Sequence, residues 1–191
     1  YEAPISFFNQ KLDKQVLKYF KLKSKKRANL SPWKKITKIV LNTKQSVNIA
    51  IIGKYVNLKD AYKSLDEALI HGGISNKVKV NLIRIESDDL KSNEIKNRLK
   101  NISGLLIPGG FGKRGTEGKI SAIKFARENK IPFLGICFGM QMAIIEFARN
   151  KLKIKKAGSS ELDKKCYPVI GLINEWDKNG KIIKGTDKDL G

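Results

Sequence analysis

Hydrophobic residues follow two alternating patterns between residues 46 and 150. Short apolar runs are typical of strands buried in a sheet, whereas apolar side chains that recur every three or four positions predict amphipathic helices. The predicted strands are residues 47–52, 78–85, 104–107 and 132–136. The predicted helices are residues 60–71, which end at Gly72-Gly73, and residues 90–99, 119–129 and 140–150.

Strands that alternate with helices predict an α/β fold. The expected architecture is a doubly wound, mainly parallel sheet with helices on both faces, because parallel strands need crossover connections. In such sheets the ligand binds beyond the carboxyl ends of the strands. Three glycine-bearing turns fall on that edge, at Gly53, at residues 109–112 and at residues 135–139.

The first 45 residues have a different character. Leu12, Val16 and Tyr19 share one helical face, and Ser31-Pro32 predicts an N-cap followed by proline at the first position of another helix. This segment has too few apolar residues to form a core of its own. We therefore expect a helical linker over residues 1–45 and the α/β domain over residues 46–191.

The chain is strongly basic, with 39 basic and 18 acidic residues and a formal net charge of +21. Of the 39 basic residues, 33 are lysine, which is less suited than arginine to bidentate contacts with phosphates and bases. The densest run, residues 21–27, contains no aromatic residue on which a base could stack. We interpret it as a solvated linker and expect no nucleic-acid partner, with contact to a polyanion as the alternative.

Other features of the composition exclude several classes of protein. No apolar run reaches the roughly 20 residues that span a bilayer, and no secretory signal opens the chain, so no membrane partner is expected. Two cysteines and one histidine supply neither a disulfide framework nor a zinc site. We expect a cytoplasmic protein without a metal site in this chain.

The strongest chemical motif is Gly-Ile-Cys-Phe-Gly over residues 135–139. It has the form of a nucleophile elbow, with cysteine in place of serine, at a predicted junction between a strand and a helix. Flanking glycines relieve crowding in such a turn, and the helix N-terminus at Phe138 favours a thiolate. Cys137 is the expected nucleophile, although a buried structural cysteine is the ordinary alternative.

The second motif is the glycine turn Pro-Gly-Gly-Phe-Gly over residues 108–112. Its backbone N–H groups could bind an oxyanion together with the N–H of Phe138, which follows the nucleophile. Residues 110–115 also match the dinucleotide fingerprint G-x-G-x-x-G. The next strand ends in Gly-Ile-Cys without the acidic residue that would hold a ribose, so oxyanion binding is the preferred interpretation.

Residues 50–56, 60–64, 108–118 and 134–141 together resemble the glutaminase domain of the CTP synthase family, which is a class I glutamine amidotransferase with a flavodoxin-like fold. The most specific segments are Gly-Lys-Tyr-Val at residues 53–56 and the block that runs from Gly109 to Lys119. The resemblance covers about residues 47–173. Residues 1–45 resemble, more loosely, the end of the synthetase domain and the linker that follows it.

The resemblance implies that Cys137 attacks L-glutamine, forms a glutamyl thioester and releases ammonia. The ammonia would pass to a synthetase domain, which aminates UTP to CTP with ATP and Mg²⁺. The resemblance assigns oxyanion or substrate binding to Gly110, Phe138, Gly139, Met140, Gln141 and Glu161. It implies no cofactor in this chain, and it implies a homo-oligomer, a tetramer in the family. It also places Arg114, Gly115 and Glu117 in a loop that responds to GTP as an allosteric activator.

One part of the family pattern is missing from the sequence. The family's general base is a histidine followed two residues later by a glutamate, whereas the one histidine here is His71, at the end of an early helix. We expect the base to lie beyond Gly191 and the isolated chain to be nearly inactive. Three alternatives stay open: another amidotransferase with a cysteine elbow, a peptidase-like relative, and a regulatory module without catalysis.

Overall fold

The computed structural model describes residues 1–24, 26, 28–54, 56, 58, 60–90, 93–110, 112–171 and 175–184. The chain divides into two compact units. One consists of Tyr1–Val47 and Ser64–Asn81, and the other of Asn48–Lys63 and Leu82–Gly191.

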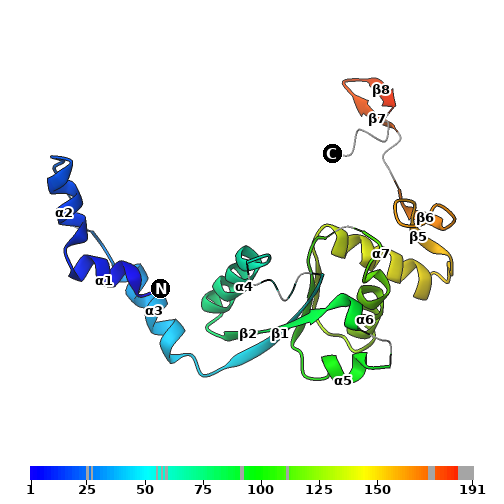
Figure 1. Cartoon of the computed structure of the whole chain (residues 1–191), viewed down its shortest axis with the longest axis horizontal. Helices are drawn as coiled ribbons and strands as arrows, with labels where there is room; N and C mark the ends of the chain where they lie inside the picture. Colours follow the sequence, from blue (N-terminus) through cyan, green and yellow to red (C-terminus); the bar gives the residue numbers. More distant parts are fainter. Residues whose placement is uncertain are drawn as a thin grey trace. The chain divides into compact units, whose positions relative to one another are not determined.

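The first unit is mainly helical. Its helices are α1 (Ala3–Asn9), α2 (Leu12–Tyr19), α3 (Ser31–Asn42) and nearly all of α4 (Lys63–Ser75), as Figure 1 shows. The two helices predicted in the linker are present, but the cap of α3 is Leu30 and not Ser31. Oδ1 of Asn29 accepts a hydrogen bond from the amide of Ser31 at 3.0 Å. The apolar face of α2 is exposed, with Tyr19 82% accessible. The first three helices bury no residue of their own.

Helix α4 differs from its prediction at both ends. It begins three residues later than expected and continues through Gly72-Gly73 to Ser75. A methyl group on Gly73 would lie 2.6 Å from Cγ2 of Val80 and 2.7 Å from the carbonyl oxygen of Val78. This glycine therefore allows close packing against the following strand and does not end the helix, which is why the sequence pattern misplaced the boundary.

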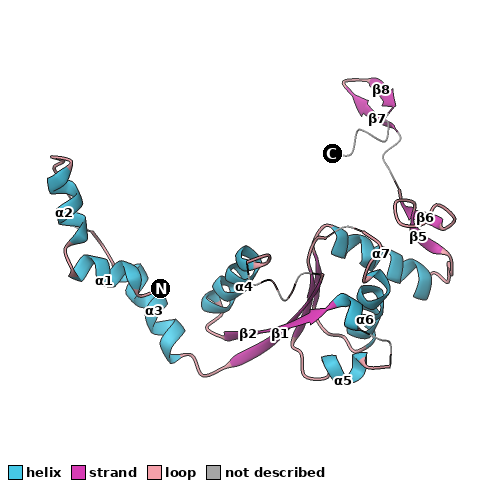
Figure 2. Cartoon of the chain, in the orientation of Figure 1, coloured by secondary structure: helices cyan, strands magenta, loops and turns pink. Residues whose placement is uncertain are grey.

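The central sheet has four strands in the order β2-β1-β3-β4. They are β1 (Ser46–Gly53), β2 (Lys79–Glu86), β3 (Gly104–Ile107) and β4 (Phe133–Gly135). Figure 2 draws the strands in magenta and labels β1 and β2. Strand β3 pairs in parallel with both β1 and β4, with Leu106 opposite Ile51 and opposite Leu134. Each boundary lies within one residue of its prediction, and the α/β class with a mainly parallel sheet is confirmed.

Three helices follow the strands of the second unit. They are α5 (Ile95–Leu99), α6 (Thr116–Glu128) and α7 (Phe138–Asn150), with a short 3₁₀ turn at Ser87–Asp89. Helix α5 is shorter than the predicted helix 90–99, and residues 91 and 92 lie outside the described part. Helix α6 begins three residues before the predicted start. Its first turn contains no hydrophobic residue, so the hydrophobic pattern did not reveal it.

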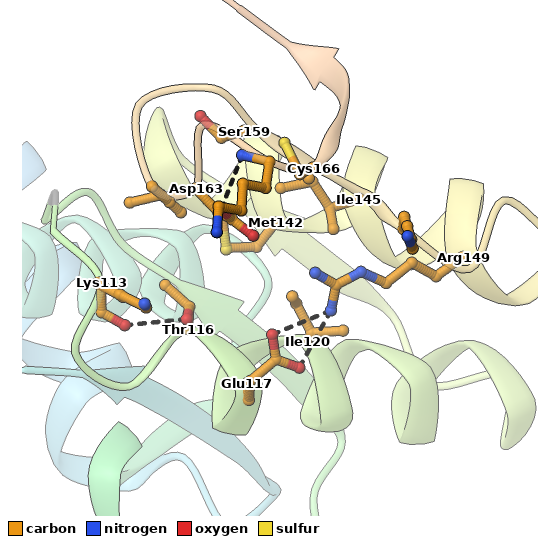
Figure 3. A pocket seen from close by; sticks show the side chains of 14 residues that line it. Lys113, Thr116, Glu117, Ile120, Met142, Ile145, Arg149, Ser159, Asp163 and Cys166 are labelled. Atoms are coloured by element: carbon orange, nitrogen blue, oxygen red, sulfur yellow. Dashed lines mark hydrogen bonds and ion pairs between the residues drawn. The ribbon is translucent and has the colours of Figure 1, made fainter.

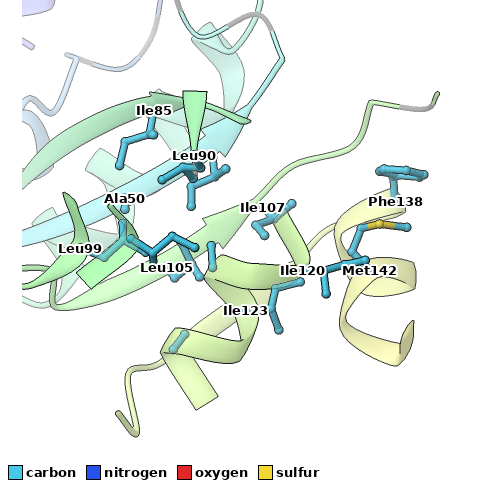
Figure 4. Packing of buried hydrophobic residues seen from close by; sticks show 14 of the residues in the cluster. Ala50, Ile85, Leu90, Leu99, Leu105, Ile107, Ile120, Ile123, Phe138 and Met142 are labelled. Atoms are coloured by element: carbon cyan, nitrogen blue, oxygen red, sulfur yellow. The ribbon is translucent and has the colours of Figure 1, made fainter. Parts of the chain in front are cut away.

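The core of the second unit lies between the sheet and helices α5 to α7. Figure 4 shows Phe138 and Met142 of α7 near Ile107 of β3 and Ile120 of α6. Phe138 and Met142 are fully buried. The residue that follows Cys137 is therefore anchored in the core, which holds the start of α7 in place.

Two further strand pairs follow α7, and the sequence pattern predicted neither. Strands β5 (Ala157–Ser159) and β6 (Tyr167–Ile170) pair in parallel, and β7 (Glu175–Lys178) and β8 (Lys181–Lys184) form an antiparallel hairpin. The turn Asn179-Gly180 has positive φ at both residues, which is the backbone that an Asn-Gly hairpin needs. That dipeptide was an available signal. No helix among the described residues is long and apolar enough to cross a membrane.

Candidate active site

The backbone at Cys137 has the geometry of a strained strand-to-helix turn. Its φ is 52° and its ψ is −109°, a conformation that non-glycine residues rarely adopt. The amides of Met140 and Gln141 donate to its carbonyl oxygen at 3.0 and 3.2 Å, so α7 begins directly at the cysteine. The side chain of Cys137 is exposed. This is the arrangement of a nucleophile elbow between β4 and α7.

Close backbone contacts require the glycines on either side of this cysteine. A methyl group on Gly135 would lie 2.6 Å from the carbonyl carbon of Gly139, and one on Gly139 would collide with the carbonyl of Ile107. The amide of Ile136 donates to that same carbonyl of Ile107 at 2.9 Å. The elbow is thereby fastened to the end of the neighbouring strand β3.

The glycine turn after β3 lies beside Cys137. A Cβ built on Gly109 would be 3.7 Å from Cβ of Cys137. Gly110 has a φ of 134°, which a side chain would strain. Phe111 of this turn is outside the described residues. The structure therefore brings together the turn that carries Gly110 and the start of α7 at Phe138, the two places from which the oxyanion donors were expected.

Two lysines that the sequence analysis did not single out face the ring of Phe138. Nζ of Lys54 lies 5.9 Å from the ring centroid and donates to the carbonyl of Gly112 at 2.9 Å. Nζ of Lys119 lies 5.0 Å from the centroid and has no hydrogen-bond partner among the described residues. Lys54 stands in the Gly-Lys-Tyr-Val segment that carried the family resemblance, so a signal for it existed.

Burial is the main influence on both ammonium groups. The pKa of Lys119 is lowered to about 8, mainly by burial and also by the nearby charge of Lys54, while Asp88 opposes the shift. Burial also lowers the pKa of Lys54, with Arg114 acting in the same direction. Lys119 is fully buried and Lys54 is 6% exposed. Two buried lysine side chains thus lie close to the elbow.

The remaining predicted residues of α7 have distinct surroundings. Gly139 is buried against β3, as described above. Met140 is exposed at a shallow apolar groove along α7, where Ile144 and Phe147 also lie. Oε1 of Gln141 is buried without a hydrogen-bond partner in the described part of the chain. The side chain of Gln141 therefore offers a buried acceptor to which a ligand could donate a hydrogen bond.

Glu161 lies in the turn between β5 and β6, and its side chain is exposed. Its amide donates to Oγ of Ser159 at 3.3 Å. In the part of the chain that is described, the structure records no contact between Glu161 and Cys137. The predicted binding of substrate by this carboxylate stays a prediction.

The loop predicted to respond to GTP is held by ion pairs. Nε of Arg114 lies 3.1 Å from Asp88, and Nη2 of Arg114 donates to the carbonyl of Lys54 at 3.3 Å. Gly115 caps α6 with a φ of 72°. Glu117 pairs with Arg149 of α7 at 3.0 Å. The loop is therefore connected both to the end of β1 and to α7.

A cavity of about 370 Å³ lies beside this loop, as Figure 3 shows, and Cys137 does not line it. Its walls come from the start of α6, from α7 and from the β5–β6 segment. Four cationic residues line it: Lys113, Arg149, Lys156 and Lys165. Cys166 also lines the cavity and is half-buried.

His71 lies on α4, in the first unit, and has contacts of its own there. Its Nε2 is 3.8 Å from the carboxylate of Glu67, and its ring centroid is 5.9 Å from that of Tyr1. The described residues contain no group of three or more histidine, cysteine, aspartate or glutamate side chains able to hold a metal ion.

Comparison with protein families identifies the class of protein that this fold and elbow define. Residues 57–185 match the family model "Glutamine amidotransferase class-I". The chain therefore belongs to the class I glutamine amidotransferases, and the class implies glutamine as substrate.

Relatives of this chain include CTP synthases, which confirms the resemblance seen in the sequence. The chain is 78% identical over its full length to the CTP synthase of Pelagibacter ubique and 49% identical over its full length to that of Zymomonas mobilis. It spans about a third (36%) of the length of either relative. A solved structure, the glutaminase domain of Trypanosoma brucei CTPS with bound acivicin, is 35% identical with a TM-score of 0.60. That match covers 64% of this chain and 48% of the other.

Proposed function

We propose that this chain provides the glutamine-hydrolysing step of a CTP synthase, with Cys137 as the nucleophile. The observation that carries the proposal is the strained, exposed Cys137 at the start of α7, directly beside the glycine turn after β3. A cysteine held in that backbone conformation presents its sulfur at the carboxyl edge of the sheet, where α/β folds bind their ligands.

The reaction proceeds through two additions to one carbonyl carbon. The sulfur of Cys137 bonds to the carboxamide carbon of glutamine, and the carbonyl oxygen takes the negative charge. The C–N bond then breaks, and the nitrogen leaves as ammonia once it has received a proton. Water attacks the resulting thioester, which gives glutamate and restores the thiol.

The oxyanion would be bound by the backbone amides of Gly110 and Phe138. Phe138 is the first residue of α7, so its amide belongs to the turn that has no acceptors within the helix. Such donors are preorganised and remain in place as charge develops on the oxygen. The buried oxygen of Gln141 would accept a hydrogen bond from the substrate, and Glu161 would bind its α-amino group.

We do not assign His71 as the base that activates Cys137, because its side chain contacts Glu67 and Tyr1. In the whole enzyme, the ammonia would pass to a synthetase domain that aminates UTP with ATP and Mg²⁺. GTP would act through Arg114, Gly115 and Glu117. We also propose a cytoplasmic, tetrameric enzyme without a nucleic-acid or membrane partner.

The test replaces the aligned segment of the Pelagibacter ubique CTP synthase with these 191 residues. In this chimera, Cys137→Ala should abolish CTP synthesis from glutamine and spare synthesis from free ammonia, because only the nitrogen source is lost. Cys166→Ala is the matched control and should keep both activities. Loss of both activities in the Cys137 variant would contradict a dedicated glutaminase role.

The same chimera separates the alternatives. Glutamine hydrolysis without CTP formation would indicate a different amidotransferase. Peptide hydrolysis without glutamine hydrolysis would indicate a peptidase-like relative. A folded chimera that forms CTP from ammonia but never hydrolyses glutamine would indicate a regulatory module.

A further inference from the structure

Two buried lysines lie against one phenylalanine ring directly behind the nucleophile elbow. Ammonium groups face aromatic rings favourably, but that attraction is small compared with the cost of removing a charge from water. Lys54 and Lys119 both bear this cost next to Phe138. Among the described residues, Lys54 makes a hydrogen bond to the backbone and the ammonium group of Lys119 makes none.

The hydrogen bond of Lys54 joins separate parts of the site. The residue follows β1 directly, its Nζ donates to the carbonyl of Gly112 at 2.9 Å, and the same Nζ lies 5.9 Å from the Phe138 ring. Gly112 ends the glycine turn that carries Gly110. The side chain of Lys54 thus contacts both the turn that carries Gly110 and the residue Phe138, whose amides are the two proposed oxyanion donors.

We propose that Lys54 is a positioning residue for glutamine hydrolysis, which holds the glycine turn at a fixed distance from the nucleophile elbow and so sets the spacing of the Gly110 and Phe138 amides. The inference rests on the proposed function. It adds a residue at the end of β1 to an oxyanion-binding site whose proposed donors follow β3 and β4.

The surroundings of Lys54 fix its own position. Arg114 donates to the Lys54 carbonyl and pairs with Asp88, so the backbone of Lys54 is held by a side chain that is itself held in place. The charges of Arg114 and Asp88 act on both lysines, and those of Glu86 and Lys54 also act on Lys119. With the side chain almost completely buried, its bond to Gly112 has little competition from water.

Lys119 provides a matched control because it has the same charge, the same ring and no hydrogen-bond partner among the described residues. Replacing it with methionine, which has a similar length, leaves no polar group unpaired. Replacing Lys54 with methionine leaves the carbonyl of Gly112 without its donor and releases the turn.

The experiment compares Lys54→Met, Lys54→Arg and Lys119→Met in the chimera described above. Lys54→Met should lower kcat for glutamine about 10- to 100-fold, somewhat less than the loss of a whole oxyanion donor, with KM for glutamine within about threefold. CTP synthesis from ammonia and the labelling rate of Cys137 by iodoacetamide should stay within about twofold, because neither needs the oxyanion donors. Lys54→Arg keeps a cationic donor and should recover part of kcat, and Lys119→Met should keep it.

A tetrahedral mimic gives an independent measurement. The aldehyde carbon of glutamate γ-semialdehyde bonds to the thiol, and its oxygen takes the place of the oxyanion. Its inhibition constant should rise in Lys54→Met by about the same factor as kcat falls, as expected for a group that acts on the transition state.

The failures are distinguishable. A parent chimera that never hydrolyses glutamine would contradict the proposed function itself. An active parent whose Lys54→Met variant keeps kcat, or in which Lys119→Met loses as much, would overturn the role of Lys54. Simultaneous loss of ammonia-dependent synthesis and Cys137 labelling in Lys54→Met would assign Lys54 to general stability instead.

Discussion

The guanidinium of Arg127 on α6 binds both carboxylate oxygens of Glu146 on α7. Its Nε lies 3.0 Å from one oxygen and its Nη2 lies 2.8 Å from the other. Glu146 is 1% exposed, and its hydrogen bond is the main reason that the pKa of Arg127 is raised. The pair joins the two helices that position the glycine turn and the nucleophile elbow.

Glu146→Gln should destabilise the chain by about 1–3 kcal/mol. The substitution removes the nearer and buried counter-charge of a partly buried guanidinium, and breaking such pairs is more costly than breaking pairs at the surface. Urea unfolding of the purified chain measures the change. Glu128→Gln is the control, because Glu128 pairs with the same arginine at 3.7 Å and is half exposed, so it should cost less than about 0.5 kcal/mol. Equal effects would show that burial of the pair does not matter.

Lys119→Met should stabilise the chain, and the gain should depend on pH. The pKa of Lys119 falls from 10.5 to about 8 on folding, so between these values the unfolded chain binds more protons than the folded one. The stability of the parent therefore rises with pH across this window, because the cost of the buried charge is lost as the group deprotonates. The gain from methionine should be about 3 kcal/mol at pH 7 and about half of that at pH 9.5.

Urea unfolding at both pH values tests this expectation. Lys124→Met is the control, since Lys124 is exposed on the same helix and should have little effect at either pH. A gain from Lys119→Met that does not change with pH would mean that packing, and not the charge, is responsible.

The central sheet was predictable because its strands are apolar runs. Residues 104–107 form a wholly buried strand with the sequence Gly-Leu-Leu-Ile. The run contains no polar residue, so its first and last residues could be predicted. The elbow was predictable because its tight turn leaves its mark in the sequence. A side chain at Gly135 or Gly139 would clash with neighbouring backbone, so glycine stands at both positions. The sequence therefore predicts a structure well where neighbouring residues alone determine it, as in this strand and this turn.

Other features depend on partners that are distant in the sequence. Gly73 resembles a helix terminator until its packing against Val80 is known. Lys119 resembles a solvated lysine because its burial depends on Phe138, which follows in another helix. Strand β5 consists of Ala-Gly-Ser, and pairing with β6, not intrinsic preference, makes it extended. The contact between Lys54 and Gly112 joins residues 58 positions apart, so no local pattern could reveal it.

Glu161→Ala in the chimera should raise KM for glutamine with a smaller effect on CTP synthesis from ammonia. The carboxylate is proposed to bind the α-amino group of the substrate, which is remote from the reacting carbon, so its loss removes uniform binding. Steady-state kinetics with both nitrogen sources provide the measurement. Asp163→Ala is the control, an exposed carboxylate in the same turn. An unchanged KM would remove Glu161 from the site.

The purified chain itself should separate alkylation from hydrolysis. Iodoacetamide needs only an accessible thiol, and Cys137 is exposed whereas Cys166 is half-buried against Gly158, so Cys137 should be labelled first. Glutamine hydrolysis also needs a group that accepts the thiol proton and protonates the leaving ammonia, assistance worth about 10²–10⁴-fold in rate. The sequence contains one histidine, and His71 is paired with Glu67 on α4.

The expected result is therefore rapid, selective labelling of Cys137 with at most trace release of ammonia. Peptide mapping by mass spectrometry follows both cysteines over time, and an ammonia assay on the same preparation follows hydrolysis. The Cys137→Ala chain shows the background of each measurement. Rapid hydrolysis that survives His71→Ala would reveal a base other than histidine in this chain. Rapid hydrolysis that is lost in His71→Ala would assign the base to His71 and overturn its exclusion from the site.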